Sequence, residues 1–113
     1  MLIMQIKPKD SSINTNAEGF LLDRNAWNEA VANAIAITED IVLTDDHWTI
    51  IYLLRDFFDQ YETAPALRIL IKKTREQWRS EKANSIYLHK LFPGGPIKQA
   101  SKIAGLPKPL KCI

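Results

Sequence analysis

The sequence predicts a mainly α-helical protein of the α+β type: a helical bundle with a small N-terminal β-hairpin and a flexible C-terminal arm. Apolar residues recur every three or four positions through most of the 113 residues, as they do on one face of a helix. Asparagine and glycine interrupt an apolar stretch near the start, which favours a turn. Pro107 and Pro109 disfavour both helix and sheet near the end. We therefore expect a compact domain at residues 1–105 and an arm at residues 106–113.

The first elements are predicted from turn and capping residues. Asn14, Asn16 and Gly19 lie between apolar residues in the stretch 13–22, which predicts a short hairpin or an irregular extended pair. Asp23 is a suitable N-cap for a first helix of about four turns. The residues at helical spacing in it are Trp27, Val31, Ala34, Ile35 and Thr38.

Two longer helices follow. Thr44 is a good N-cap, and Asp45 and Asp46 complement the dipole of the helix that it begins. The wide apolar stripe of this core helix is Ile50, Leu53, Leu54, Phe57, Phe58 and Tyr61. Pro65 suits the first turn of the next helix. Its apolar face is Leu67, Leu70, Ile71, Thr74 and Trp78.

Two short helices complete the domain. The first is expected from Ser85 to Leu91, ending before Pro93. Pro96 then opens a helix that Gly105 terminates. Its inward residues are Ile97, Ala100, Ser101 and Ala104.

Composition excludes several protein classes. With 46% hydrophobic and 25% charged residues, the chain has the composition of one globular domain. The apolar start is too short for a signal peptide and no stretch approaches a membrane span, so we expect a cytoplasmic protein without a membrane partner. One cysteine and two histidines do not suffice for a disulfide framework or a closed zinc site, and we expect neither metal nor cofactor.

Three motifs resemble sites but have simpler explanations. Gly94-Gly95 lacks the spacing of nucleotide-binding loops and is interpreted as a turn. His47 has no nucleophile nearby in the sequence, which favours a packing or capping role. Asp45 and Asp46 are explained by the helix dipole. The sequence therefore predicts no hydrolase site.

Charge is distributed unevenly. From residue 82 onward there are six lysines and no acidic residue, whereas the preceding part has nine basic and thirteen acidic residues. The third helix also carries basic residues around its apolar face: Arg68, Lys72, Lys73, Arg75 and Arg79. A helical nucleic-acid-binding or regulatory module is therefore an alternative function, and a solvated basic face is the simpler explanation.

Cys112 is the candidate reactive residue. It is the sole cysteine, it is next to last, and it ends a proline-stiffened segment that offers little sequence in which to bury it. Eight residues from Leu106 to Ile113 span at most about 26 Å when extended. Lys108 and Lys111 favour the thiolate form modestly and suit docking to an acidic partner. We interpret Cys112 as a carrier thiol on a tether.

The segment 91–113 closely resembles the C-terminus of the DsrC/TusE family of sulfur carriers. The resemblance extends upstream, in order, through Leu43-Thr44 with His47-Trp48, Arg55-Asp56-Phe57 and 64–68, with Gly19 and Trp27 fitting the start. It implies that Cys112 is the family's penultimate cysteine, which accepts sulfur as a persulfide and passes it on. It also implies a helical bundle with an N-terminal hairpin and a flexible C-terminal arm.

One departure favours the TusE-like branch. The sulfite-reductase branch has a second cysteine eleven positions before the penultimate one, and Ser101 stands there. A serine cannot form a disulfide. The resemblance then implies a sulfurtransferase that accepts sulfur from a TusBCD-type complex and delivers it to an MnmA-type tRNA 2-thiouridine synthase for wobble-uridine thiolation, with tRNA contact possible only indirectly. A sulfite-reductase-associated subunit using Cys112 alone is the remaining alternative.

Overall fold

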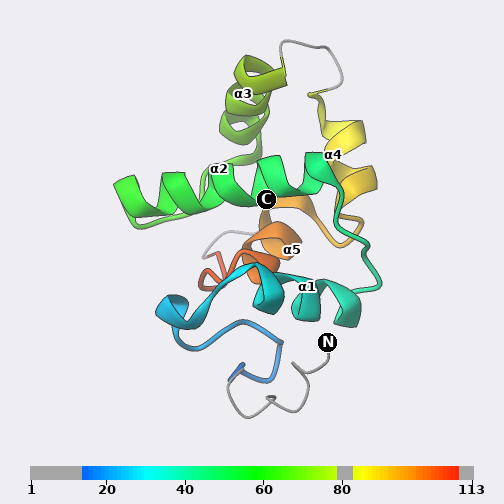
Figure 1. The fold of residues 1–113 in the computed structure, drawn as a ribbon. Coiled ribbons are helices and arrows are strands. Elements are labelled where there is room, and N and C mark those ends of the chain that lie inside the picture. Colours follow the sequence, from blue (N-terminus) through cyan, green and yellow to red (C-terminus); the bar gives the residue numbers. More distant parts are fainter. Residues whose placement is uncertain (1–13, 79–82, 110–113) are drawn as a thin grey trace.

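The computed structural model describes residues 14–78 and 83–109 (Figure 1). In these ranges the chain forms one 3-10 helix and five α-helices. Their bounds are η2 (Arg24–Ala26), α1 (Glu29–Thr38), α2 (Asp45–Tyr61), α3 (Leu67–Trp78), α4 (Ser85–Leu91) and α5 (Pro96–Ile103). The predicted mainly helical architecture is confirmed.

Helix α5 lies at the centre of the bundle. It packs against α1, α2 and α4, while α3 packs against α2. In Figure 1 the long helix α2 crosses the molecule between α3 and α4 on one side and α1 on the other. The short α5 is therefore enclosed, and six of its eight residues are buried.

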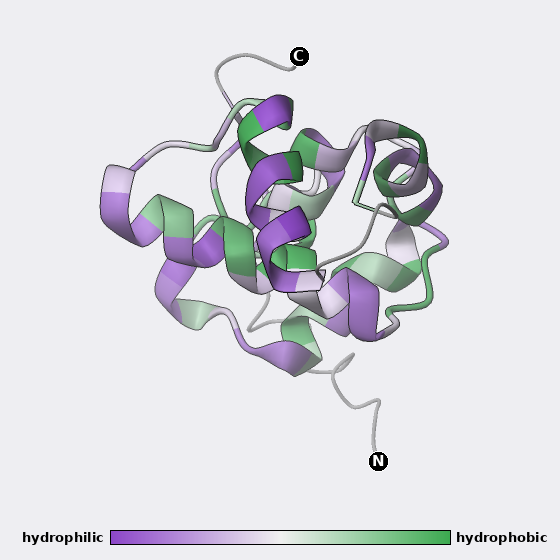
Figure 2. Cartoon of the chain, turned by 90° about the horizontal axis from the view of Figure 1, so that it is seen from above, coloured by the Kyte–Doolittle hydropathy of each residue, from purple (hydrophilic) through white to green (hydrophobic). Residues whose placement is uncertain are grey.

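The core combines apolar residues from every α-helix. Polar and apolar residues alternate along the helices in Figure 2, as expected of amphipathic elements around one core. The largest fully buried apolar side chains are Phe20, Ile50, Ile51, Leu54, Leu70, Leu88, Phe92, Ile103 and Leu106.

The first turn of α2 is closed by a histidine. Thr44 and His47 form a capping box, in which His47 Nδ1 accepts from the Thr44 backbone N–H at 3.0 Å. The other ring nitrogen, Nε2, donates to the Leu91 carbonyl at the end of α4, 2.8 Å away. This confirms the capping and packing role, and it ties α2 to α4 through the neutral form of the ring.

Gly105 reverses the chain after α5. Its N–H donates to the Lys102 carbonyl and the Leu106 N–H donates to the Ser101 carbonyl, the pair of bonds of a Schellman motif. Gly105 has φ +75°, and a Cβ there would lie 2.5 Å from Trp27 Cδ1. The predicted helix stop is confirmed, and glycine is required both by the backbone and by the indole.

The predicted N-terminal hairpin is not found among the described residues. Ile13, the first residue of the predicted stretch, lies outside the described residues. In residues 14–22, Thr15 and Leu21 form an isolated antiparallel bridge. The Asn16 side chain accepts from the Glu18 and Phe20 N–H groups and closes a loop. Phe20 and Leu21 are both buried, although neighbours on a strand face opposite sides. An irregular extended pair results.

The first predicted helix is interrupted. Asp23 caps η2, and Trp27 and Asn28 are extended, so that Asn28, not Asp23, is the N-cap of α1. Trp27 leaves the helix because its indole N–H donates to the Ile103 carbonyl at the end of α5. The later helices confirm the predictions closely, except that Pro65 precedes α3 instead of lying in its first turn.

Replacing His47 should flatten the pH dependence of stability. Burial lowers the pKa of His47, although the hydrogen bond to Leu91 and the charge of Asp46 oppose this. The folded protein therefore favours the neutral ring. The contribution of this ring to the free energy of unfolding is complete above the pKa of histidine in the unfolded chain, about 6.5, and it is lost as the pH falls through the lower pKa of the folded protein. Urea unfolding at pH 7.5 and 5.5 should show a smaller pH-dependent loss for His47→Gln than for wild type.

The matched control for this experiment is His89→Gln, which removes an exposed histidine on α4. An equal pH-dependent loss in wild type and His47→Gln would contradict the assignment of the neutral, buried ring.

Gly105→Ala should destabilise the protein more than Gly95→Ala. Both glycines have positive φ, so alanine at either position costs about 1–3 kcal/mol in backbone strain. At Gly95 no atom lies within 4 Å of the added Cβ, whereas at Gly105 the indole of Trp27 blocks it. Overpacking there adds about 1–3 kcal/mol. Equal free energies of unfolding for the two variants would contradict the close contact.

Candidate functional site at the root of the C-terminal arm

The structure describes the arm as far as Pro109. Cys112 and Lys111 lie outside the described residues, so their predicted roles are not tested by the geometry. Lys108 is exposed, and its Nζ lies 3.1 Å from Glu18 Oε2 in the loop that follows the Thr15 bridge. We call residues 103–109 the arm root, since they lead from the end of α5 towards Cys112.

Two side chains from distant elements bind the last carbonyls of α5. The Trp27 indole N–H donates to the Ile103 carbonyl at 2.8 Å. Arg55 Nη1, from the middle of α2, donates to the Ala104 carbonyl at 2.6 Å. These bonds satisfy acceptors that a helix end otherwise leaves without an intrahelical partner.

The two binding side chains also contact each other. The Arg55 guanidinium lies over the Trp27 ring, 4.0 Å from its centroid. Burial lowers the pKa of Arg55, and Asp59 opposes this change, but a guanidinium keeps its charge in proteins. The site is therefore a fixed cation stacked on an indole.

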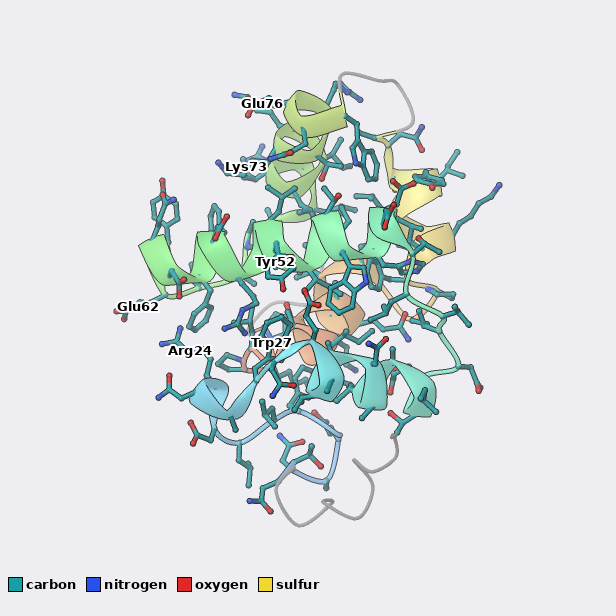
Figure 3. The ribbon with its side chains drawn as sticks, in the orientation of Figure 1. Arg24, Trp27, Tyr52, Glu62, Lys73 and Glu76 are labelled. Carbon is teal, nitrogen blue, oxygen red and sulfur yellow. The ribbon has the colours of Figure 1, made fainter. Side chains whose placement is uncertain are left out.

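Further aromatic residues support Trp27 from α2. Tyr52 meets Trp27 edge to face at 5.8 Å between ring centroids and stacks on Trp48 at 6.1 Å. Its hydroxyl donates to Glu29 Oε2 at the start of α1, 2.6 Å away. Figure 3 shows Trp27 and Tyr52 close together between α1 and α2.

The segment after Gly105 packs against the domain at two points. Leu106 and Pro109 are buried, whereas Pro107 and Lys108 are exposed. The exposed Lys108–Glu18 pair adds a surface ion pair, which typically contributes at most about 1 kcal/mol. The division of the chain at residue 105 remains a prediction, and residues 106–109 contact the domain.

Ser101 lies inside the core on α5. It is fully buried, and its Oγ has no hydrogen-bond partner among the described residues. The neighbouring polar residues on α5 are paired: Gln99 and Lys102 both donate to the Glu39 carboxylate. Burial raises the pKa of Glu39, but these hydrogen bonds outweigh it and the net pKa is lowered. Ser101 therefore stands out as an unpaired buried hydroxyl.

The basic face of α3 has its own contacts. Arg75 Nη2 donates to the Ala83 carbonyl at 3.1 Å, which gives it a structural use, and Arg79 lies outside the described residues. A hollow of about 470 Å³ nearby is lined by Leu53, Lys73, Glu76 and Gln77. Figure 3 shows Lys73 and Glu76 across α2 from Trp27. The acidic Glu76 beside Lys73 does not favour an anion site.

Other kinds of site are not found in the described part of the chain. In residues 14–78 and 83–109 there is no group of three or more histidine, cysteine, aspartate or glutamate residues placed to hold a metal ion. No helix in these ranges is long and apolar enough to cross a membrane.

Sequence reasoning missed the most organised part of this region. It left open whether the idle arm docks against Arg55 or Arg68, and it placed Trp27 inside a helix. No local pattern signals hydrogen bonds that join residues 49 and 76 positions apart. The glycine after α5 was the available signal, because it marked where the helix ends.

Comparison with known proteins identifies the family. A family model described as DsrC like protein matches residues 7–113. Sulfurtransferase TusE of Pectobacterium atrosepticum is 51% identical over 102 residues, which cover 90% of this chain and 94% of that protein. Sulfurtransferase TusE of Salmonella choleraesuis is 49% identical over 113 residues, the whole of both chains.

Solved structures have the same fold. The crystal structure of the oxidized gamma-subunit of the dissimilatory sulfite reductase (DsrC) from Archaeoglobus fulgidus has a TM-score of 0.81 and 43% identity, covering 89% of this chain and 92% of that one. The NMR structure of Allochromatium vinosum DsrC has a TM-score of 0.78 and 44% identity, covering 88% of each chain.

These relatives confirm the predicted sulfurtransferase activity and the role in a sulfur relay. The sulfite-reductase alternative is less favoured, because relatives named as sulfurtransferases match at about 50% identity over nearly the whole chain. The chain belongs to the DsrC-like protein family.

Proposed function

We propose that this sulfurtransferase carries sulfane sulfur as a persulfide on Cys112. It accepts the sulfur from a TusBCD-type donor complex and passes it to an MnmA-type tRNA 2-thiouridine synthase, in the cytoplasm, for wobble-uridine thiolation. The observation that carries the proposal is that the chain has a single thiol, next to last, a few residues beyond a root held by the domain.

The transfer step is an exchange between sulfur atoms. The Cys112 thiolate attacks the terminal sulfur of a donor persulfide, and a new S–S bond forms on Cys112. The donor's own S–S bond breaks, and the donor cysteine leaves as a thiolate. Electrons balance without an oxidant or reductant, and the same exchange in the next partner unloads Cys112.

Chain length limits where the partners bind. Cys112 is three residues beyond Pro109, so their Cα atoms lie within about 11 Å of each other. With Leu106 and Pro109 packed on the domain, a donor or acceptor cysteine must approach close to the arm root. The exposed Lys108 then lies within the region that a partner covers.

Lys108 and Lys111 are proposed to assist docking. The exposed pair with Glu18 is weak, so Lys108 exchanges it easily for a carboxylate of a partner. Lys111 is next to the thiol in sequence and favours its thiolate form. Contact with tRNA is assigned to the synthase and is indirect for this chain.

Ser101 supports a mechanism that uses one thiol. It occupies the position at which the sulfite-reductase branch has its second cysteine, and its hydroxyl cannot form the disulfide or trisulfide of a two-cysteine carrier.

Cys112→Ser should abolish sulfur loading. After incubation with a cysteine desulfurase, cysteine and the upstream relay proteins, intact mass spectrometry should show a gain of one sulfur, about 32 Da, on wild type alone. The unfolding temperature should hardly change. In cells that lack the native protein, this variant should fail to restore wobble thiolation, whereas wild type should restore it.

Ser101→Cys tests whether the position of the thiol matters, because it places a thiol at another site in the same chain. Combined with Cys112→Ser it should not restore thiolation, since residue 101 is buried. Normal thiolation with Cys112→Ser alone would refute the proposal.

Ser101→Ala should leave transfer intact and keep or raise stability. The change removes a buried hydroxyl that has no partner in the described part of the chain, and such a group costs about 1–3 kcal/mol. Urea unfolding and the mass assay measure the two effects. A loss of sulfur transfer at unchanged stability would assign Ser101 a chemical role and contradict this interpretation.

A further inference from the structure

We propose that Trp27, Arg55 and Gly105 form a root clamp that fixes the direction in which the arm leaves the domain, and that they act as positioning residues for sulfur transfer. The inference rests on the proposed function, because it assumes that Cys112 carries the sulfur.

The clamp completes the end of α5. Each of the last four carbonyls, from Ser101 to Ala104, accepts a hydrogen bond. Leu106 and Gly105 supply those for Ser101 and Lys102 from the turn that follows α5. Trp27 and Arg55 supply those for Ile103 and Ala104 from other elements. The arm therefore starts from a helix end at which no carbonyl is left unpaired.

The clamp holds three consecutive residues. Ile103 and Ala104 are bound through their carbonyls, and Gly105 lies so close to Trp27 that a Cβ would be within 2.9 Å of three atoms of that residue. Rotation of the chain at this point would break hydrogen bonds or force the backbone into the indole. The structure thus leaves one path from α5 into Leu106.

Arg55 is suited to this role by shape as well as by charge. Its planar guanidinium stacks on Trp27 and donates to Ala104 in the same geometry. A lysine ammonium has no plane to stack and makes no rigid fork. Arg55→Lys therefore keeps the positive charge but removes the planar group that stacks on Trp27 while it donates to Ala104.

Direction matters because the reaction depends on alignment. An exchange between sulfur atoms requires a collinear approach, and misplacement by about 1 Å can reduce a rate by about 100-fold. Six residues separate Gly105 from Cys112, so a change in the backbone direction at the root displaces the thiol further than it displaces Leu106. Loss of the clamp should slow transfer inside the complex without changing the surface that binds the partner.

The test is single-turnover transfer of sulfur from loaded protein to its acceptor. Arg55→Lys and Trp27→Phe, which lacks the indole N–H, should each lower the maximal rate about 5-fold to 10-fold at nearly unchanged half-saturating concentration of acceptor. Arg24→Lys is the matched control, because Arg24 also lies over an aromatic ring, Phe58, and its ion-pair partner is Asp59 on α2 and not a carbonyl of the arm root. Unchanged rates in both clamp variants would overturn the inference.

A second experiment reports the direction in which the arm leaves the domain. Cys112 is the sole cysteine, so a nitroxide can be attached there without further mutation. Paramagnetic broadening of backbone amides should be concentrated on one region in wild type and in Arg24→Lys, and spread over more of the surface in Arg55→Lys. An identical pattern in Arg55→Lys would overturn the clamp even if transfer were slower.

The two proposals fail in different ways. If wild type gains no sulfur from a loaded donor, the carrier role of Cys112 is refuted, while the broadening pattern still decides whether Arg55 directs the arm. If wild type loads and transfers normally and the clamp variants do the same, the carrier role holds and the clamp is refuted. Circular dichroism should show native helix content for Arg55→Lys, and Trp27→Phe then serves as an independent variant.

Discussion

The constraint on which this structure depends is the hydrogen bonding of the last turn of α5. A helix that ends inside a protein must find donors for its final carbonyls, because burying them unpaired is costly. Here the glycine turn supplies two donors, and Trp27 and Arg55 supply the others. The path of Trp27 out of the first helix, the Cβ-free position at Gly105 and the inward reach of Arg55 all follow from that requirement.

An eight-residue helix is marginal on its own, so α5 owes its stability to the elements around it. Pro96 begins it, and α1, α2 and α4 enclose it. His47 binds the end of α4 and so fixes the support on that side. The domain is thus organised around the segment that leads to the thiol, which explains why so small a protein devotes its core to a short helix.

Much of this was predictable because capping and turn residues act locally. Thr44, Pro96 and Gly105 mark helix ends wherever the rest of the chain lies, and the apolar spacing of α2 and α3 is read directly from the sequence. The hairpin prediction failed because the Asn16 side chain replaces strand pairing in the loop. The break at Trp27 and the role of Arg55 could not be predicted, since both are determined by partners that only folding brings close. The carrier role of Cys112 rests on its position in the sequence and on the resemblance, and it stays a prediction.

The buried hydroxyl of Ser101 bears on how the protein withstands oxidation. A carrier with two nearby thiols can convert a sulfenic acid into an internal disulfide and so halt further damage. With serine in that position and one cysteine in the chain, no such internal rescue exists. Recovery of an oxidised Cys112 then depends on thiols from other molecules, such as the cellular low-molecular-weight pool. If Cys112 is the carrier, as proposed, the relay slows under oxidative stress as the supply of those reductants falls.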